Sequence, residues 1–420
     1  MAGDGGGGVS AKHPRHHLTA HPSFLPKPSM RSFDDDLAPL HEASLHRTLR
    51  PLDSPQSPLV RTGGREIINF SSNDYLGFAS AEPVRSAFKQ GLDLYGAGAG
   101  ASRLVCGTLP PHAALERTLA TFKKTEAALT FSSGYATALG ALPALCGPGD
   151  FILLDKLSHA CLIDGAKLSG ATLRVFPHNH LGKLEHLLQW ARAKATATSR
   201  ILVVTESIFS MDGDWADLWD MVRLKDTYGA LLLLDEAHAF GIHGPQGRGL
   251  AAKLGLAARI DLQMGTFSKA AGLSGGYLCG SHALIDLLIN RARSFIYSTA
   301  PSPALAHATG EVLRHWLPTA FGEDRRARLW RSLSHLTTAL EGRIPEPASA
   351  IIPLIIGPEA EALRLSATLL EAGFLIPAIR YPTVAKGRAR LRLALTASHT
   401  PEQIDALAAT LLPLLPPVAG

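Results

Sequence analysis

One lysine, Lys269, lies in the segment GTFSKAAGLSGGY (265–277), which consists almost entirely of small residues. An amine that captures a carbonyl compound as a Schiff base must be accessible and must spend time unprotonated, and desolvation lowers its pKa. The small neighbours leave room around the amine, and the hydroxyls of Thr266 and Ser268 are suited to a phosphate. The segment therefore predicts a lysine that binds an aldehyde covalently.

A second candidate, Asp235, ends the very apolar stretch LLLLD (231–235). A desolvated carboxylate is costly unless it meets a cation. That cation is either an arginine in a structural ion pair or the protonated nitrogen of a ring-shaped ligand, and the residues alone leave both alternatives open. In the second case His238, three residues further on, would lie close to the same ligand.

An anion site is expected in TFSSGYATALGAL (130–142), where a short strand gives way to a helical pattern at Ser133 and Gly134. Free backbone N–H groups and the positive end of the helix would then face an anion. Tyr135 and His159 add flat rings that can stack on an aromatic ligand. An aldehyde-binding amine, an acid for a ring nitrogen, a phosphate cradle and stacking rings are together what pyridoxal 5′-phosphate (PLP) requires.

Three other motifs favour different functions, and each is weak. The loop YGAGAGASR (95–103) lacks the complete G-x-G-x-x-G of a dinucleotide site and is expected to be a flexible loop that lines a site. LLLLDEAHAFG (231–241) contains the letters of a helicase box, but no G-x-x-x-x-G-K-[ST] precedes it. His178, His180 and His186 form no tetrahedral ligand set, so we expect surface histidines and no metal site.

The elements that must position these residues are short apolar runs separated by segments of helical character. The runs expected as buried strands are ALTF (128–131), FILLD (151–155), LRVF (173–176), ILVVTE (201–206), ALLLLDEA (230–237) and LQMGTF (262–267). This alternation is typical of a parallel sheet covered by helices on both faces. Polar residues follow the runs, at the edge where open α/β sheets bind ligands.

The remaining segments complete an α/β expectation with a mostly parallel sheet and a smaller C-terminal α+β domain. Residues 1–29 are expected to be a disordered tail, and residues 30–65 a helix, over 32–50, followed by a linker. A large ligand-binding domain is expected over 66–302 and the small domain over 303–420.

Composition excludes several classes of protein. The 420 residues are 46% hydrophobic and 18% charged, with a formal net charge of only +5 and no basic stripe, so nucleic-acid binding is not indicated. No apolar run is long enough for a transmembrane helix, and no membrane association is expected. The four cysteines have no CxxC spacing, which favours a reducing, cytoplasmic compartment.

Six ordered motifs resemble one family, the α-oxoamine synthases of fold type I. The motifs are NFSSNDYLGF (69–78), GASRLVCGT (100–108), TESIFSMDGD (205–214), LLDEAHAFGIHGPQGRG (233–249), GTFSKAAGLSGGY (265–277) and RLRLALTASHT (390–400). The resemblance implies a PLP enzyme with an aminotransferase-like fold, and a homodimer whose active sites lie at the interface. Within the family, the chain looks most like the branch that condenses L-alanine with a pimeloyl thioester for biotin synthesis. Glycine C-acetyltransferase and 5-aminolevulinate synthase types are the alternatives, and a PLP aminotransferase is a more distant one.

The resemblance also implies cofactor roles for individual residues. Lys269 would hold PLP covalently, Asp235 would pair with the ring nitrogen, and His159 would stack on the ring. His238 would bond the ring hydroxyl, with Ser210 nearby. The residues implied for the phosphate are Gly134, Tyr135 and Thr266, with Ser298 and Thr299 reaching it across the dimer interface.

Substrate contacts follow from the same resemblance. Arg392 would bind the amino-acid carboxylate, although Arg388 and Arg390 share its strand face by parity, so that the choice comes from the match alone. Arg380 is the residue that points to the alanine-using branch. The other residues implied for substrate are Asn73, Glu206 and, in the N-terminal helix, Arg47.

Overall fold

The computed structural model describes residues 31–415. Its contacts divide the chain into a unit that ends at Arg47 and a unit that begins at Thr48. The predicted tail, residues 1–29, lies outside the described residues.

The described part of the first unit, residues 31–47, contains one helix, α1 (Phe33–Glu42), which begins after the N-cap residue Ser32. The helix ends earlier than the predicted 32–50. Ser44 adopts a positive φ of 56°, and the N–H of Leu45 donates back to the carbonyl of Leu40 at 2.7 Å. A left-handed residue just past the last turn is a common way for a helix to stop.

The second unit holds all the other elements. Its main helices are α2 (Glu82–Tyr95), α3 (Pro110–Lys123), α4 (Gly134–Leu145), α5 (Ala160–Leu168), α6 (Leu181–Lys194), α7 (Leu218–Thr227), α8 (Leu250–Lys253), α9 (His282–Arg291), α10 (Arg293–Ile296), α11 (Pro303–Glu311), α12 (Ala320–Ala339), α13 (Glu359–Glu371) and α14 (Pro401–Leu411). Its strands are β1 (Leu59–Thr62), β2 (Arg65–Asn69), β3 (Ala127–Phe131), β4 (Phe151–Asp155), β5 (Thr172–Phe176), β6 (Ile201–Glu206), β7 (Leu231–Asp235), β8 (Leu262–Thr266), β9 (Gly276–Gly280), β10 (Ile351–Gly357), β11 (Phe374–Leu375), β12 (Ala378–Ile379) and β13 (Ala389–Ala394).

The large sheet has seven strands in the order β3-β9-β8-β7-β6-β4-β5. The six predicted runs are β3 to β8, each within about two residues of its expected bounds. The seventh strand, β9, has no counterpart among the predicted runs, and it runs antiparallel to both β3 and β8. Its sequence, GYLCG, has glycine at both ends and an apolar run of only three residues, which is why the pattern missed it.

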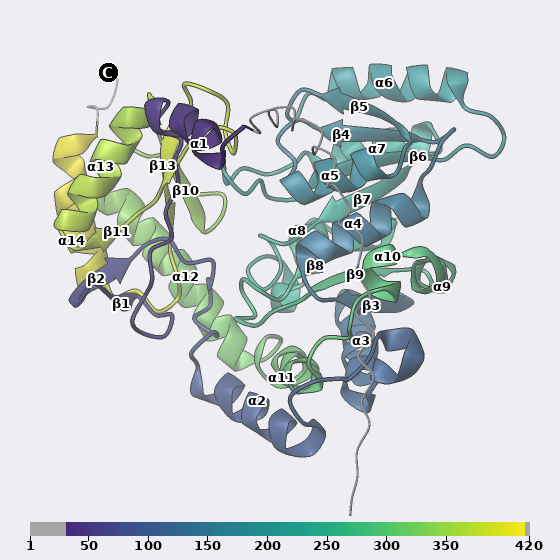
Figure 1. Cartoon of the computed structure of the whole chain (residues 1–420), viewed down its shortest axis with the longest axis horizontal. Coiled ribbons are helices and arrows are strands. Elements are labelled where there is room, and N and C mark those ends of the chain that lie inside the picture. The colour runs from purple at the N-terminus through teal and green to yellow at the C-terminus, as the bar shows by residue number, and fades with distance from the viewer. Residues whose placement is uncertain (1–30, 416–420) are drawn as a thin grey trace, which may run out of the picture. The chain divides into compact units, whose positions relative to one another are not determined.

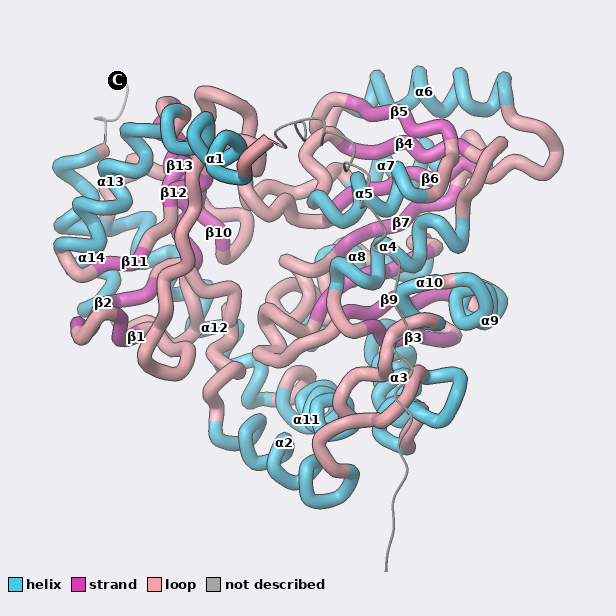
Figure 2. The backbone as a smooth tube through the Cα atoms, in the orientation of Figure 1, coloured by secondary structure: helices cyan, strands magenta, loops and turns pink. Residues whose placement is uncertain are grey.

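Helices cover both faces of this sheet, as Figure 2 shows. In β4 and β6, alternate side chains belong to two different core clusters, one with side chains of α6 and α7 and the other with side chains of α4, α5 and α9. Both faces are therefore buried, and this explains why the parallel strands read as uninterrupted apolar runs. The predicted fold class, a mostly parallel α/β sheet with a smaller C-terminal α+β part, is confirmed.

Two small sheets lie apart from the large one, with the long helix α12 running between them and the large sheet (Figure 1). One is antiparallel, in the order β10-β13-β12. In the other, β2 pairs antiparallel with β1 and parallel with β11, so a segment near residue 68 joins a strand near residue 374. The domain boundaries expected at 66 and 303 stay a prediction.

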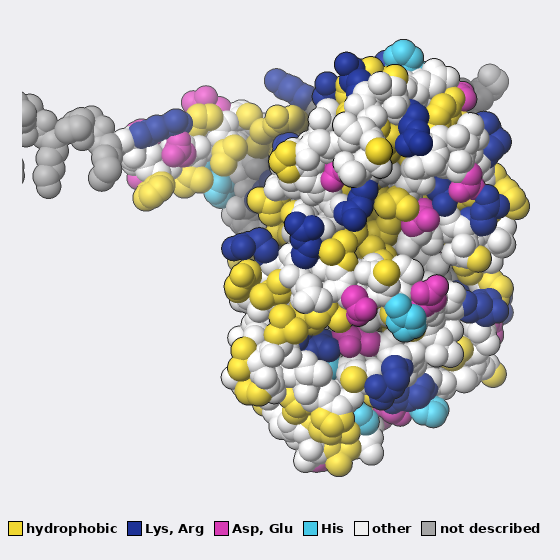
Figure 3. Space-filling view, turned by 90° about the vertical axis from the view of Figure 1, so that its right-hand side faces the viewer, with side chains coloured by type: hydrophobic (Ala, Val, Ile, Leu, Met, Phe, Trp, Pro, Cys, Tyr) yellow, Lys and Arg dark blue, Asp and Glu magenta, His cyan; other side chains and the backbone are white. Residues whose placement is uncertain are grey.

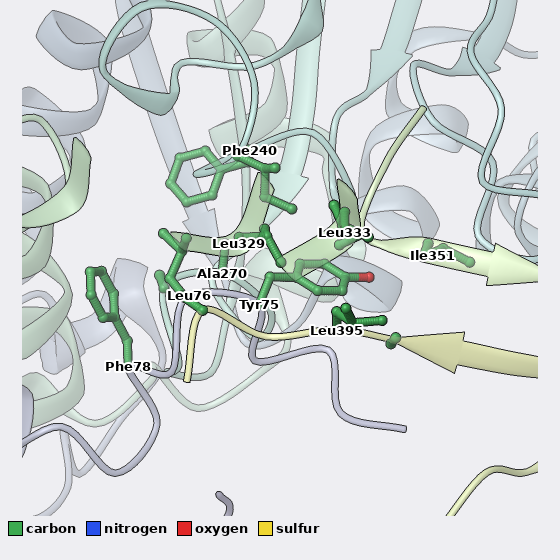
Figure 4. Packing of buried hydrophobic residues seen from close by; sticks show 14 of the residues in the cluster. Tyr75, Leu76, Phe78, Phe240, Ala270, Leu329, Leu333, Ile351 and Leu395 are labelled. Carbon is green, nitrogen blue, oxygen red and sulfur yellow. The ribbon is translucent and has the colours of Figure 1, made fainter. Parts of the chain in front are cut away.

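One core cluster joins the segment 70–78 to α12 and to the strands of the small sheets. Figure 4 shows the Tyr75 ring among Leu329, Leu333 and Leu395, with its hydroxyl oxygen pointing away from Leu76. Tyr75 itself has 0% exposure. Packing holds the Tyr75 ring in place, and the hydroxyl oxygen lies at the edge of the cluster, where it can form hydrogen bonds with polar groups.

A buried ion pair connects α3 to the loop that follows β7. The ammonium of Lys123 lies 2.5 Å from a carboxylate oxygen of Glu236, and these side chains are 1% and 0% exposed. Lys123 also donates to the carbonyl of Arg248, and the N–H of Ala251 donates to Glu236. Because Glu236 directly follows Asp235, this pair fixes the chain next to the carboxyl end of β7.

Replacing Lys123 with methionine should lower the free energy of unfolding by about 3 kcal/mol, because the Glu236 carboxylate would stay buried without its cation. Urea unfolding followed by circular dichroism measures the change. Lys124→Met removes an exposed lysine from the neighbouring position and is the matched control. Equal destabilisation by the two variants would contradict the importance of the pair.

On the surface drawn in Figure 3, lysine and arginine side chains are scattered among acidic and uncharged ones. Within residues 31–415, no helix is both long enough and apolar enough to cross a membrane.

Candidate active site

Three strands of the large sheet end in polar residues at the same edge. Glu206, Asp235 and Thr266 are the last residues of β6, β7 and β8, and the first two are register partners. Two positions before each of them, an apolar side chain of the same strand packs with α4 and α5. Because side chains two positions apart on a strand point to the same face, all three polar side chains lie on the face covered by these helices. The helices whose N-termini stand over this face are α4 and α5.

A cavity of about 220 Å³ opens at this edge. The residues that line it are Ser133, Gly134, Tyr135, His159, Cys161, Glu206, Asp235, Ala237, His238, Met264, Gly265, Thr266, Ser268 and Lys269. Lys269, Asp235, His238 and His159, to which the resemblance assigns the cofactor ring, therefore share one cavity.

The amine of Lys269 stands in the loop between β8 and β9. Burial lowers its pKa, although the negative charges of Asp235 and Glu206 oppose the shift, and the charge of Arg392 adds to it. A lowered pKa increases the share of free amine at neutral pH, which is the form that attacks a carbonyl.

The glycines around Lys269 are needed for close packing as well as for space. Gly272 has a φ of 67°, and an added Cβ would stand 2.3 Å from the backbone nitrogen of Ala79. An added Cβ at Gly276 would stand 2.4 Å from the hydroxyl of Thr137. The expectation that small residues leave room for an aldehyde is therefore incomplete, because these two glycines let the lysine loop lie against other segments.

Glu206 and His159 are joined at the cavity wall. The N–H of His159 donates to the Glu206 carboxylate at 2.5 Å. Burial, followed by the negative charge of Asp235, raises the pKa of Glu206 to about 8. The raised pKa favours the protonated form of the Glu206 carboxyl near neutral pH.

An anion cradle lies at the start of α4. The Ser133 hydroxyl caps the helix by accepting the N–H of Ala136 at 3.0 Å, and the first turn leaves the N–H groups of Gly134 and Tyr135 without an intrahelical carbonyl. Thr266 faces Gly134, because an added Cβ at Gly134 would stand 3.4 Å from the Cβ of Thr266. The hydroxyl of Thr266 lies 2.7 Å from that of Ser268.

A chain of hydrogen bonds connects the cavity to the small antiparallel sheet. The Tyr75 hydroxyl lies 2.7 Å from Nδ1 of His238 and 3.1 Å from Oδ1 of Asn73. Asn73 Oδ1 also accepts from Nη2 of Arg392 at 3.1 Å. Burial, with the charges of Lys269 and Arg392, lowers the pKa of His238 well below its usual range, so the ring is neutral.

Arg388, Arg390 and Arg392, which strand parity places on one face, differ in burial and in hydrogen-bond partners in the structure. Arg392 donates through Nε to the carbonyl of Ser210 and is 5% exposed. Arg390 is equally buried, but it pairs with Asp212 at 2.7 Å. Arg388 precedes β13 and is exposed.

Seven of the residues expected at the site do not line this cavity. Two of them, Asn73 and Arg392, belong to the chain of hydrogen bonds that connects to it, and the other five are Ser210, Ser298, Thr299, Arg380 and Arg47. Ser210 contributes its carbonyl to Arg392, Thr299 forms an isolated β-bridge with Ser102, and Ser298 and Arg380 also lie outside the lining. Arg47 is exposed and ends the first unit. The roles implied for these residues stay predictions.

Two residues at the site were not singled out from the sequence. Cys161 lines the cavity two positions after His159, and Tyr75 links Asn73 to His238. The sequence offered one signal for them, because each lies two residues after a residue that the motifs did identify.

His178 is not a surface histidine but the centre of a charged cluster. Nδ1 lies 3.1 Å from Asp155, which ends β4, and Nε2 lies 2.8 Å from Asp214. Burial by itself would lower the pKa of His178, but the hydrogen bonds to Asp155 and Asp214 raise it to about 10. Among residues 31–415, no group of three or more metal-ligating side chains could hold a metal ion.

Replacing His178 with asparagine should lower the free energy of unfolding by about 2 kcal/mol at pH 6, because two bonds to charged groups are lost. The folded-state pKa is raised, so this stabilisation is complete below the unfolded pKa near 6.5 and is lost as pH rises through about 10. Urea unfolding of wild type and variant between pH 6 and 10.5 measures the difference. The exposed His186→Asn is the control, and a difference that grows with pH would contradict the prediction.

Comparisons with known proteins agree with this geometry. The sequence profile of the family described as aminotransferase class I and II matches residues 65–411. A curated 8-amino-7-oxononanoate synthase of Methylorubrum populi is 45% identical over 399 residues, which cover 94% of this chain and 98% of that one.

Solved structures are also similar. A serine palmitoyltransferase of Sphingomonas wittichii has a TM-score of 0.84 and 33% identity, covering 92% of this chain and 99% of that one. A structure described as SPT with PLP internal aldimine has a TM-score of 0.83 and 29% identity, covering 91% and 96%. The resemblance to PLP enzymes of fold type I is confirmed, and PLP is the cofactor. The chain belongs to the class I and II aminotransferase family of PLP enzymes and, within it, to the α-oxoamine synthases.

Proposed function

We propose that this chain condenses L-alanine with a pimeloyl thioester, carried by CoA or an acyl-carrier protein, to give 8-amino-7-oxononanoate, CO2 and the free thiol for biotin synthesis. The observation that carries the proposal is the single cavity shared by the amine of Lys269 and the carboxylate of Asp235. The name of the curated relative that is 45% identical supports this branch of the family.

The residues of the cavity fit PLP. Asp235 supplies an anion for the ring nitrogen, and the start of α4 supplies N–H donors for the phosphate. An added Cβ at Gly134 would contact the Thr266 side chain at 3.4 Å, so the start of α4 and Thr266 lie next to each other and are proposed to bind the same phosphate. When bound, PLP supplies an aldehyde for the amine and a ring that accepts the electrons of a broken bond at Cα.

Lys269 is proposed to move the proton. Its lowered pKa keeps part of the amine unprotonated, so that Nζ can take the α-proton of alanine. Asp235 would hold a proton on the ring nitrogen. In this assignment the neutral ring of His238 contacts the ring hydroxyl, and Tyr75 fixes its orientation.

Arg392 is proposed to bind the alanine carboxylate. Its Nε and Nη2 donate to Ser210 and Asn73, which orients the guanidinium and leaves further N–H donors for a carboxylate. The ion pair of Arg390 with Asp212 gives that arginine a structural partner instead. His159 is proposed to stack on the ring and to donate a hydrogen bond to the oxygen of the thioester carbonyl as charge develops there.

The homodimer is proposed on a surface next to Thr299. Leu104 and Val105 are 52% and 78% exposed in the turn that follows Ser102, and Ser102 bridges to Thr299. Two exposed apolar side chains beside this bridge would be buried if a second copy of the chain packed against them, which favours a dimer interface at this place. Sedimentation of Val105→Asp, with Val175→Asp as the exposed control on β5, tests this assignment; a dimer unaffected by Val105→Asp would contradict it.

The substrates are tested by a matrix of alanine, glycine and serine against pimeloyl, acetyl, succinyl and palmitoyl thioesters. Thiol release is the readout. We expect turnover to be fastest with alanine and the pimeloyl thioester. Predominant turnover of glycine with succinyl-CoA or acetyl-CoA, or of serine with a palmitoyl thioester, would contradict the proposal and identify that pair as the substrates. Half-transamination of a keto acid at catalytic speed would indicate an aminotransferase.

A further inference from the structure

The side chain of His159 is held at one ring nitrogen by a single neighbouring residue. His159 is the N-cap of α5, and its Nδ1 accepts the backbone N–H of Cys161 at 3.3 Å. The Sγ of Cys161 lies 3.1 Å from the same nitrogen. Two groups of Cys161 that can donate therefore converge on Nδ1.

Together these two contacts favour one position for the proton of the imidazole. A backbone N–H is always a donor, so the nitrogen that faces it must offer a lone pair. In a neutral imidazole, one nitrogen accepts and the other carries the hydrogen. With Nδ1 as the acceptor, the hydrogen of neutral His159 is on Nε2.

The charges around the two groups favour the same arrangement. Burial, followed by the negative charges of Asp235 and Glu206, raises the pKa of the Cys161 thiol far above its usual range, so the S–H donor persists at neutral pH. Desolvation lowers the pKa of His159 more than Asp235 raises it, and the charge of Lys269 lowers it further. His159 is therefore neutral when it accepts.

The other side of the ring is available to a ligand. His159 and Cys161 both line the cavity, and within residues 31–415 no hydrogen bond engages Nε2 of His159. The N–H at Nε2 is thus a donor that the described part of the chain leaves for something bound in the cavity.

We propose that Cys161 is a positioning residue that fixes the Nε2–H form of His159, so that His159 serves this site as a hydrogen-bond donor and not as a base. The inference rests on the proposed function, in which His159 faces cofactor and thioester. Proton removal from the amino acid then belongs to Lys269, and His159 supplies a fixed donor for the developing charge on the thioester oxygen.

Two substitutions separate the thiol from the backbone donor. Cys161→Ala removes the S–H but keeps the N–H, and Cys161→Ser restores a donor of similar size. We expect kcat to fall about fivefold in the alanine variant, as for one lost hydrogen bond, with an unchanged KM for alanine. The serine variant should recover most of the rate. Cys146→Ala removes the same atoms from a buried site outside the cavity and should leave kcat unchanged.

The decisive measurement is the nitrogen chemical shift of the His159 imidazole in 15N-histidine-labelled protein, with PLP bound and after its removal. His159→Gln assigns the signal. We expect the neutral Nε2–H form in wild type and Cys161→Ser between pH 6.5 and 8.5. In Cys161→Ala the longer backbone contact of 3.3 Å is the one left on Nδ1, so we expect a smaller excess of the Nε2–H form and a minor Nδ1–H population. A wild-type signal of Nδ1–H or of imidazolium at pH 7.5, or a wild-type kcat in Cys161→Ala, would overturn the inference.

The measurement distinguishes this inference from the proposed function. The tautomer is read in the protein whether or not a given substrate turns over. If alanine and the pimeloyl thioester are not substrates but the Nε2–H form is present, only the reaction is wrong. If they are substrates but Nδ1 carries the proton, only the inference about Cys161 is wrong.

Discussion

Replacing Lys269 with alanine should lower kcat by about 10⁴-fold and abolish covalent binding of the cofactor, because one amine is assigned both the attachment and the proton transfer. The fold should persist, since the Lys269 side chain borders the cavity and, within residues 31–415, makes no ion pair. Borohydride reduction followed by peptide mass spectrometry measures the attachment, and thiol release measures the rate.

Two further results sharpen the Lys269 experiment. Lys167→Ala, an exposed lysine in the last turn of α5, should retain wild-type attachment and rate. Small primary amines added to Lys269→Ala should restore part of the rate, because they replace the missing base. A Lys269→Ala variant that keeps more than a tenth of the wild-type rate would refute the assignment.

Replacing Asp235 with asparagine should lower kcat by about 10³-fold, because an amide cannot keep a proton on the ring nitrogen. Asparagine has the same shape, and its Oδ1 can still accept the N–H of Ala237, which Asp235 accepts at 2.9 Å. Asp235 also raises the pKa of the free Lys269 amine, so in protein from which PLP has been removed the variant should show a lower pKa for this amine in its pH-dependent reaction with an aldehyde probe.

Glu206→Gln is the matched control for Asp235→Asn. The two residues are register partners at the ends of neighbouring strands, and both line the cavity. Because the raised pKa of about 8 already leaves Glu206 mostly protonated, glutamine should resemble its neutral form and lower kcat by no more than about tenfold. If kcat fell more in Glu206→Gln than in Asp235→Asn, Glu206 and not Asp235 would be the residue that pairs with the ring nitrogen.

The strands β3 to β8 were predictable because a sheet covered on both faces requires continuous apolar runs, and that requirement is local. The positions of Asp235, Lys269 and Gly134 relative to such runs were sufficient to indicate a PLP site. The strand β9 was missed, because its own apolar run is only three residues long and its place between β3 and β8 depends on pairing with distant segments. The pairing of β2 with β11 was also missed, because it joins segments about three hundred residues apart.

The sequence by itself determined the fold class, the family and the types of residue that the chemistry needs, because these depend on local pattern and on residue identity. Only the tertiary structure decided which arginine of β13 reaches Asn73, that burial raises the pKa of Glu206, and which nitrogen of His159 accepts from Cys161. Each of these depends on burial and on contacts between segments distant in the chain. Strand parity treats Arg388, Arg390 and Arg392 alike, and only the packing of β13 against Asn73, Ser210 and Asp212 separates them.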